Sequence, residues 1–135
     1  MKVDTDMFGT LDIAMSGLKA NRKQMDVVAS NIVNARTTDA GAGEPYRRLE
    51  AIMKTAGDGV AGVEVADVVE DAGDFQKVLK PGHPQADAQG YVRMPNVNLP
   101  QEMISLNLAT RAYEASAAIL KRYQRMVETS LGLLR

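Results

Sequence analysis

Apolar residues in the first quarter of the chain recur at alternating spacings of four and three residues. Such a heptad repeat keeps one stripe of a helix turned toward a partner helix. It predicts a helix from about Thr5 to Asn34, capped by Asp4 or Thr5, whose side-chain oxygens can accept from the first free N–H groups. The positions of this N-terminal seam are Met7, Leu11, Ala14, Leu18, Asn21, Met25, Val28 and Ile32.

A second repeat of the same kind fills the C-terminal quarter of the chain. Asn98 is a suitable cap, Pro100 suits a first-turn position, and Glu102 places a negative charge at the positive end of the helix dipole. The pattern therefore predicts a helix from just after Asn98 to about Leu133. Its seam comprises Met103, Leu106, Thr110, Tyr113, Ala117, Leu120, Gln124, Val127, Leu131 and Leu134.

The C-terminal helix carries a second apolar stripe beside this seam. One antiparallel partner helix covers a single stripe, so two stripes require more neighbours than one chain supplies. The pattern therefore predicts assembly with further chains. The second stripe comprises Ile104, Leu108, Ala112, Ala115, Ile119, Met126 and Leu133.

Short strands are predicted in the middle of the chain. Residues 48–54, 62–70, 75–80 and 91–94 are separated by turns rich in Gly, Pro and Asp, and the second run alternates valines with a possible bulge near Ala66. Three or four such strands make a small domain.

The predicted fold class is therefore α+β. Long N- and C-terminal helices are expected to pack as an antiparallel coiled coil, with a small β-rich insert between them. The corresponding domains are residues 1–35, the N-terminal helix; 36–98, the insert; and 99–135, the C-terminal helix.

Composition narrows the function. Hydrophobic residues make up 45% of the 135 residues but aromatic residues only 4%, which favours helix-on-helix packing over a thick core with an enclosed pocket. Sixteen basic and 17 acidic residues give no strong field toward nucleic acid or membrane. There is no cysteine, which excludes disulfides, thiol catalysis and zinc–thiolate sites. The N-terminal segment lacks the apolar core of a signal peptide, and nothing is apolar enough to span a bilayer.

Candidate catalytic groups lack companions. His83 is the only histidine and lies in a Pro-Gly-His-Pro sequence that is typical of a turn, without a second residue at catalytic or metal-ligand spacing. The glycines at 57, 59 and 62 lack the Lys-Ser/Thr ending of a phosphate loop, so a surface loop is the better interpretation. We therefore expect a protein that is not an enzyme and has no cofactor or metal.

Two polar groups allow more than one interpretation. Lys121, Arg122 and Arg125 form a basic patch that either interacts with the dipole of the C-terminal helix or docks an acidic neighbour. Asn31 and Asn34 bracket an apolar pair at the end of the N-terminal helix, where asparagine is an ordinary C-cap residue.

Four segments nevertheless resemble a known family. Residues 29–35 (ASNIVNA) resemble the Asn-rich motif of bacterial flagellar rod and hook proteins, and Pro45-Tyr46-Arg47, the run from Pro81 to Met103, and residues 111–115 (RAYEA) resemble the proximal-rod members of that family. The resemblance is collinear and covers nearly the whole chain. One difference is Ser116, where the C-terminal motif is expected to have Asn.

The resemblance implies a structural subunit of the basal-body rod, the drive shaft that transmits torque for motility. Family members stack helically, their terminal helices line the export channel, and the insert faces outward. The implied partners are copies of the chain itself, the other rod proteins of the FlgB, FlgF and FlgG types, the rod-base adaptor FliE, and the flagellar export apparatus. The implied location is the rod within the periplasm, reached without a cleaved signal peptide.

The expected assembly interface combines both seams with the second stripe and the family motifs. It comprises Met7, Leu11, Leu18, Met25, Val28, Asn31, Ile32, Asn34, Met103, Leu106, Leu108, Arg111, Tyr113, Ile119, Leu120, Val127 and Leu131. The alternative function is a stand-alone coiled-coil adaptor that binds one soluble partner. A small enzyme is the third possibility, and no catalytic constellation supports it.

Overall fold

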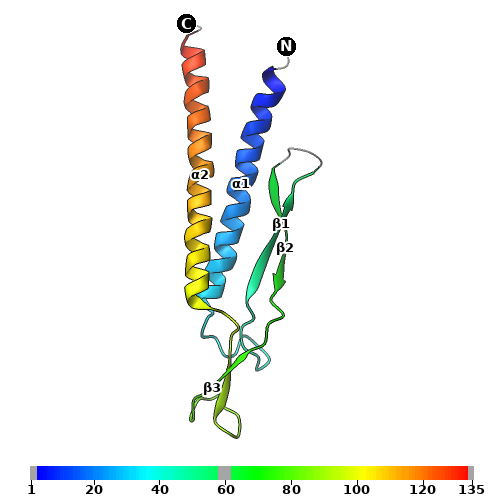
Figure 1. Ribbon diagram of the computed structural model, residues 1–135, viewed down its shortest axis with the longest axis vertical. Helices are drawn as coiled ribbons and strands as arrows, with labels where there is room; N and C mark the ends of the chain where they lie inside the picture. The colour runs from blue at the N-terminus through cyan, green and yellow to red at the C-terminus, as the bar shows by residue number, and fades with distance from the viewer. Residues whose placement is uncertain (1–2, 58–61, 134–135) are drawn as a thin grey trace.

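Two long helices dominate the structure. The computed structural model describes residues 3–57 and 62–133, with side-chain environments from residue 9 onward at the N-terminal end. Helix α1 spans Val3–Val33 and helix α2 spans Leu99–Gly132. They lie side by side in opposite directions, so that both chain ends are at the same end of the molecule (Figure 1). Both predicted helices are confirmed, with ends that differ by one or two residues.

The start of α2 follows the predicted capping chemistry. Oδ1 of Asn98 accepts a hydrogen bond from the backbone N–H of Gln101 at 3.2 Å. Pro100 lies in the first turn, where its missing N–H costs nothing, and Glu102 supplies the acidic residue of that turn. The cap and the heptad together explain why the helix begins here.

Helix α1 packs on two sides. One side faces α2, and the other faces the hairpin formed by β1 (Leu49–Thr55) and β2 (Val63–Glu70), so α1 lies between them (Figure 1). The contact with the hairpin includes a hydrogen bond from the N–H of Val63 to Oγ of Ser16 at 3.1 Å. The buried apolar residues are mostly small, which gives a thin core; among the described residues they are Ala14, Ala20, Val27, Val28, Val92 and Ala109.

The seam of α2 differs from the predicted seam in one of its two heptad positions. Leu106, Tyr113, Leu120 and Val127 are at least half-buried, as predicted, and so are Thr110 and Ala117 of the alternate position. Met103 and Gln124 of that position are exposed, and the residues just before them, Glu102 and Tyr123, are covered instead. Ala109 and Ser116 are covered as well.

The placement of Met103 in the seam is therefore wrong. Met103 is 54% exposed, whereas Glu102 is 1% exposed. Periodicity assigns the inward position to the apolar residue of a neighbouring pair, and here a carboxylate takes it because partners neutralise its charge. Gln124 and Leu131, also placed in the seam, are exposed, and Leu134 lies outside the described residues.

The first hairpin confirms the predicted bulge. Strands β1 and β2 pair antiparallel, with Ile52 opposite Asp67 and Met53 opposite Val65. Ala66 therefore has no partner across the ladder and is the extra residue of a β-bulge. The bulge changes which side chains of β2 face α1 partway along the strand.

The second hairpin lies beyond the end of the helix pair (Figure 1). Strand β3 (Gln76–Leu79) pairs antiparallel with β4 (Tyr91–Met94), and the four strands form two separate two-stranded sheets. The turn predicted after β3 is confirmed: the N–H of His83 donates to the carbonyl of Lys80 at 3.2 Å, and Gly82 has a φ of 88°. A positive φ at this third turn position is why glycine follows proline there.

Candidate assembly site: a polar junction and an exposed helix face

Asn31 is fully buried near the end of α1, and its side-chain amide uses its whole hydrogen-bonding capacity. Nδ2 donates to the carbonyl of Leu49 at 2.9 Å and to Oε2 of Glu102 at 3.0 Å. Oδ1 accepts from the N–H of Leu49 at 2.9 Å and from the hydroxyl of Tyr46 at 3.0 Å. Two donors and two lone pairs are therefore satisfied. The amide pairs with Leu49 as a neighbouring strand would and so fixes where β1 begins.

Glu102 provides the contact to α2. Its Oε1 accepts a hydrogen bond of 2.6 Å from Nε of Arg48, and Nη1 of Arg48 also donates to Oδ2 of Asp71 at 3.3 Å. A buried carboxylate is tolerated only when it is paired and hydrogen-bonded, and here both carboxylate oxygens have donors. The hydrogen bond to Glu102 raises the pKa of Arg48 above its ordinary value, which keeps the guanidinium charged.

The loop after β2 is held to the same cluster. The N–H of Gly73 donates to Oδ1 of Asp71 at 2.8 Å, and this bond, followed by those from Arg48, lowers the pKa of the Asp71 carboxyl. Oδ1 of Asn96 accepts from the N–H of Arg48 at 2.8 Å, and its Nδ2 donates to the carbonyls of Asp71 and Gly73. Nη1 of Arg47 donates to the same two carbonyls, at 3.0 and 3.1 Å.

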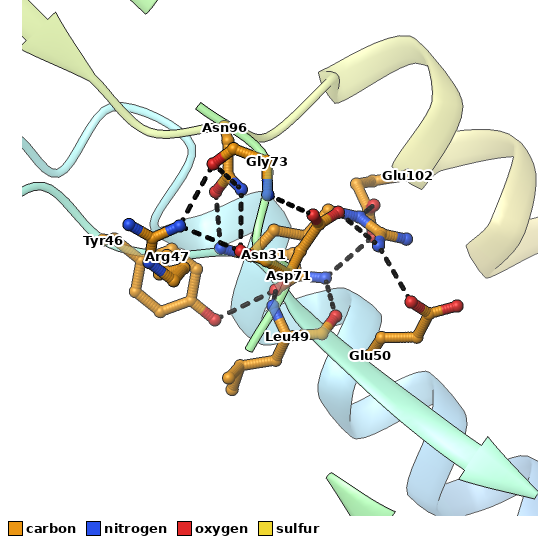
Figure 2. A network of polar contacts seen from close by, with 10 residues as sticks. Asn31, Tyr46, Arg47, Leu49, Glu50, Asp71, Gly73, Asn96 and Glu102 are labelled. Carbon is orange, nitrogen blue, oxygen red and sulfur yellow. Dashed lines mark hydrogen bonds and ion pairs between the residues drawn. The ribbon is translucent and has the colours of Figure 1, made fainter. Parts of the chain in front are cut away.

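These residues form what we call the polar junction (Figure 2). They come from the end of α1, the start of β1, the loop after β2, the segment before α2 and the first turn of α2. Among the described residues, no buried side-chain nitrogen or oxygen lacks a hydrogen-bond partner. The junction is thus a fully satisfied structural network, and it fixes how both helices and the insert meet. Its members are Asn31, Tyr46, Arg47, Arg48, Asp71, Asn96 and Glu102.

Asn34 caps α1 with its side chain and without the left-handed backbone that makes asparagine a common C-cap residue. Nδ2 of Asn34 donates to the carbonyl of Ser30 at 2.9 Å, one turn back, and its Oδ1 accepts from the hydroxyl of Thr37. Helix α1 ends one residue earlier, at Val33. Capping explains Asn34, whereas it does not explain Asn31, whose partners all lie outside α1.

The second apolar stripe of α2 is exposed for most of its length. Ile104 is 62% exposed, Leu108 64%, Ile119 51% and Met126 50%, and we call these four residues the outer stripe. They recur at spacings that keep them on one side of the helix. An apolar row of this length on a surface is typical of a site that binds another protein.

The structure separates the predicted interface residues into groups. Those at least partly covered within the chain are Leu11, Leu18, Met25, Val28, Ile32, Leu106, Tyr113, Leu120 and Val127. Asn31 lies in the polar junction and Asn34 in the cap. The exposed group is Met103, Leu108, Arg111, Ile119 and Leu131, and the side chain of Met7 lies outside the described residues.

Sequence reasoning did not find the other members of the polar junction. Glu102 was assigned only to the helix dipole, and Arg48 only to the start of a strand. The residues around Glu102 give no signal that it is buried, because its counter-charge, Arg48, lies 54 residues away in the sequence. Spacing rules do not reach that far.

Neither His83 nor the basic patch that the sequence offered lies in surroundings suited to catalysis. Nδ1 of His83 accepts from the N–H of Gln85 at 3.1 Å within its turn. Lys121, Arg122 and Arg125 are exposed, and the last turn of α2 contains no basic residue, so the dipole contributes little to their role. In the described parts of the chain, no three His, Cys, Asp or Glu side chains gather as a metal site would require, and neither helix is long and apolar enough to cross a membrane.

Two family models match the chain, one over each terminal helix. Residues 11–40 match the family model described as flagella basal body rod protein, and residues 88–133 match that of the flagellar basal body rod FlgEFG protein C-terminal. The two matches cover most of both helices and define the class, the flagellar basal-body rod proteins.

Full-length relatives specify the member of that class. The chain is 37% identical over 130 residues to the flagellar basal-body rod protein FlgC of Salmonella typhimurium, covering 94% of this chain and 97% of the relative. It is 38% identical over 127 residues to the FlgC of Agrobacterium fabrum, covering 91% of each, and 36% over 145 residues to that of Bacillus subtilis, covering 93% and 97%. The chain belongs to the FlgC family and is a structural subunit of the flagellar basal-body rod.

Proposed function

We propose that the chain is a subunit of the proximal rod within the periplasm. It assembles helically around the export channel, and the resulting tube transmits torque from the motor. The observation that carries this proposal is the outer stripe, an apolar helix face that the chain does not cover itself. Each Å² of apolar area buried between subunits contributes roughly 25 cal/mol to the stability of the assembly. Many such contacts together would hold the tube rigid.

The helix pair would form the wall of this tube as an antiparallel coiled coil. The inward positions of α2 alternate at four and three residues, as do those of the N-terminal seam. A close approach of the two helices supports such packing: a Cβ on Gly17 of α1 would lie 3.4 Å from Oγ of Ser116 on α2. Ser116, the difference from the family motif, therefore faces a glycine.

The polar junction lies where the three proposed domains meet. Residues 1–35 and 99–135 would be the rod core, and residues 36–98 the outward-facing domain. The β1–β2 hairpin supports this orientation, because it lies on the side of α1 opposite α2 (Figure 1). The proposed partners are further copies, rod proteins of the FlgB, FlgF and FlgG types, the adaptor FliE, and the export apparatus, which the chain would enter without a cleaved signal peptide.

A change within the outer stripe tests the assembly role most directly. Leu108→Asp places a charge on a residue that the isolated chain leaves exposed, so helicity and expression should be retained. Rod assembly and swimming should be lost, because a buried unpaired carboxylate opposes the contact between subunits. Asn107→Asp, at the adjacent exposed position, is the matched control and should swim normally.

Two seam changes extend the test. Leu18→Asp and Leu120→Asp should also abolish rod assembly and motility while the chain is still expressed. Normal swimming of the Leu108→Asp variant, with the chain present in purified basal bodies, would contradict the proposal. A chain that stays helical and monomeric and is absent from wild-type basal bodies would indicate the adaptor instead.

A further inference from the structure

A groove opens between the helices near their free ends. Helices α1 and α2 converge at the polar junction and separate toward the chain ends (Figure 1). The space between them, about 650 Å³, is lined mainly by Leu11, Met15, Leu120, Tyr123 and Val127. These side chains are apolar except for the tyrosine hydroxyl. The groove is therefore a concave apolar surface on a different side of α2 from the outer stripe.

The rim of the groove and the edge of the outer stripe carry opposite charges. Glu128 lines the groove and is exposed. Arg111, one turn after Leu108, is also exposed. The ion pairs found among the described residues involve neither Arg111 nor Glu128. Both charges are thus available to a neighbouring molecule.

The spacing of these groups along α2 defines one register. In a helical assembly all copies run in the same direction, so α2 of one copy lies roughly parallel to α2 of the next. Glu128 follows Arg111 by 17 residues, which is about 26 Å along a helix. A copy displaced by that distance brings Ile104 and Leu108 to the level of Leu120 to Val127, where the groove is.

We propose that the groove between α1 and α2 of one copy receives Ile104 and Leu108 of a second copy, with Arg111 of that copy paired to Glu128 at the rim. The inference rests on the proposed rod function and specifies one subunit contact. Because the groove and the stripe are different surfaces, the contact is heterologous. It therefore repeats from copy to copy and does not close into a symmetric dimer. The second copy fits the groove because the chain itself carries an exposed apolar helix face with the complementary charge.

Cysteine pairing tests the register, because the chain has no cysteine of its own. Arg111→Cys and Glu128→Cys are combined in one chain, expressed in the flagellated bacterium in place of the natural chain, and basal bodies are oxidised and examined on non-reducing gels. A disulfide requires Cα atoms within about 7 Å, so two positions about 26 Å apart on one helix form it only between copies. We expect a ladder of dimers and longer species.

The control variant combines Arg122→Cys with Glu128→Cys. Arg122 is exposed like Arg111 and lies on the same side of the helix, but it is eleven residues, about 16 Å, further along and out of register with Glu128 of the neighbouring copy, so this pair should give no ladder. Basal bodies that contain the Arg111/Glu128 cysteine variant without any ladder, or with a disulfide to a different protein, would overturn the contact and leave the rod function intact. Absence of the unsubstituted chain from basal bodies would instead overturn the rod function.

Charge reversal provides a second, independent measurement if the cysteine variant fails to assemble. Arg111→Glu and Glu128→Arg should each lower the number of rods per cell several-fold, since each places two like charges together. The double variant restores opposite charges and should recover at least half of the wild-type number. A double variant no better than the two single variants would contradict the proposed pairing.

Discussion

Nε of Arg48, just before β1, donates a 2.6 Å hydrogen bond to Oε1 of Glu102, in the first turn of α2. This bond joins the insert to the C-terminal helix, and Asn31 joins the same carboxylate to the N-terminal helix at 3.0 Å. One buried carboxylate thus holds all three parts of the chain. In a structural subunit of the rod, such a connection lets the insert and both helices move as one body.

Replacing Arg48 should lower the stability of the fold more than replacing Glu102. Arg48→Met leaves Glu102 buried and without a counter-charge, and we expect a loss of about 3 kcal/mol in the free energy of unfolding, at the low end of the range for broken buried ion pairs because Arg48 keeps some exposure. Glu102→Gln keeps the shape and removes the charge, and it should cost only about 1–2 kcal/mol. Urea denaturation of the purified variants measures both values, and the opposite order would contradict the assigned roles.

Replacing Asn31 tests the role of its side-chain amide, which pairs with the backbone of Leu49 as a neighbouring strand would. Asn31→Asp removes both donors and places a second carboxylate against Glu102, so it should destabilise the chain more than Asn31→Ala at neutral pH. Asn31→Ala leaves both the N–H and the carbonyl of Leu49 without their partners, whereas Asn31→Asp leaves only the carbonyl, at about 1–3 kcal/mol for each group. Adding Glu102→Gln should restore part of the stability lost in the Asn31→Asp variant, because it removes the repulsion between two carboxylates. The same addition should restore none of the stability lost in the Asn31→Ala variant. A double-mutant cycle without that difference would argue against direct contact.

Asp71 should contribute a pH-dependent part of the stability. The N–H of Gly73, followed by Arg48, lowers the pKa of Asp71 below its ordinary value of 3.8. The folded state therefore binds the proton less readily than the unfolded state does, and the contribution is complete above pH 3.8. It is lost as the pH falls through the lower folded-state pKa. The stability difference between wild type and Asp71→Asn should shrink on acidification below pH 4, whereas a constant difference would exclude this origin.

Glycines in α1 should respond to alanine according to their surroundings. A Cβ at Gly9 meets no atom within 4 Å, so Gly9→Ala should raise stability by about 1 kcal/mol through helix propensity alone. At Gly17 the new Cβ would touch Oγ of Ser116 at 3.4 Å, so the gain should be smaller. Gly17→Leu should push the helices apart and lower stability by about 1–3 kcal/mol. Thermal unfolding of the three variants gives the order, and a stabilising Gly17→Leu would show that α2 does not approach there.

Local features of the fold could be predicted because their causes are local. The helix cap at Asn98, the turn at Gly82 and the extra residue at Ala66 each follow from neighbours in the sequence. Apolar spacing identified both helices and the exposed face of α2. The same spacing assigned Met103 to the seam, because periodicity ranks residues by their own polarity and takes no account of partners that come from elsewhere.

Only the tertiary structure could identify the polar junction. The groups that make Glu102 tolerable inside the protein are Arg48 and Asn31, 54 and 71 residues away in the sequence. Whether a buried charge is stabilising depends on desolvation and on hydrogen-bond geometry, and both are properties of the folded arrangement. Nothing in the neighbourhood of Glu102 along the chain distinguishes it from an exposed helix residue.

The sequence by itself determined the two helices, the strand-rich middle and the membership of a rod family, since periodicity, turn chemistry and motifs are encoded residue by residue. Tertiary structure decided which side of α2 faces α1, that the insert forms two separate hairpins, and that one carboxylate joins the three segments. The physical reason is that burial and electrostatic pairing depend on neighbours in space. An alternation of three and four residues predicts a stripe, but only the packed chain decides which residue of an adjacent pair turns inward.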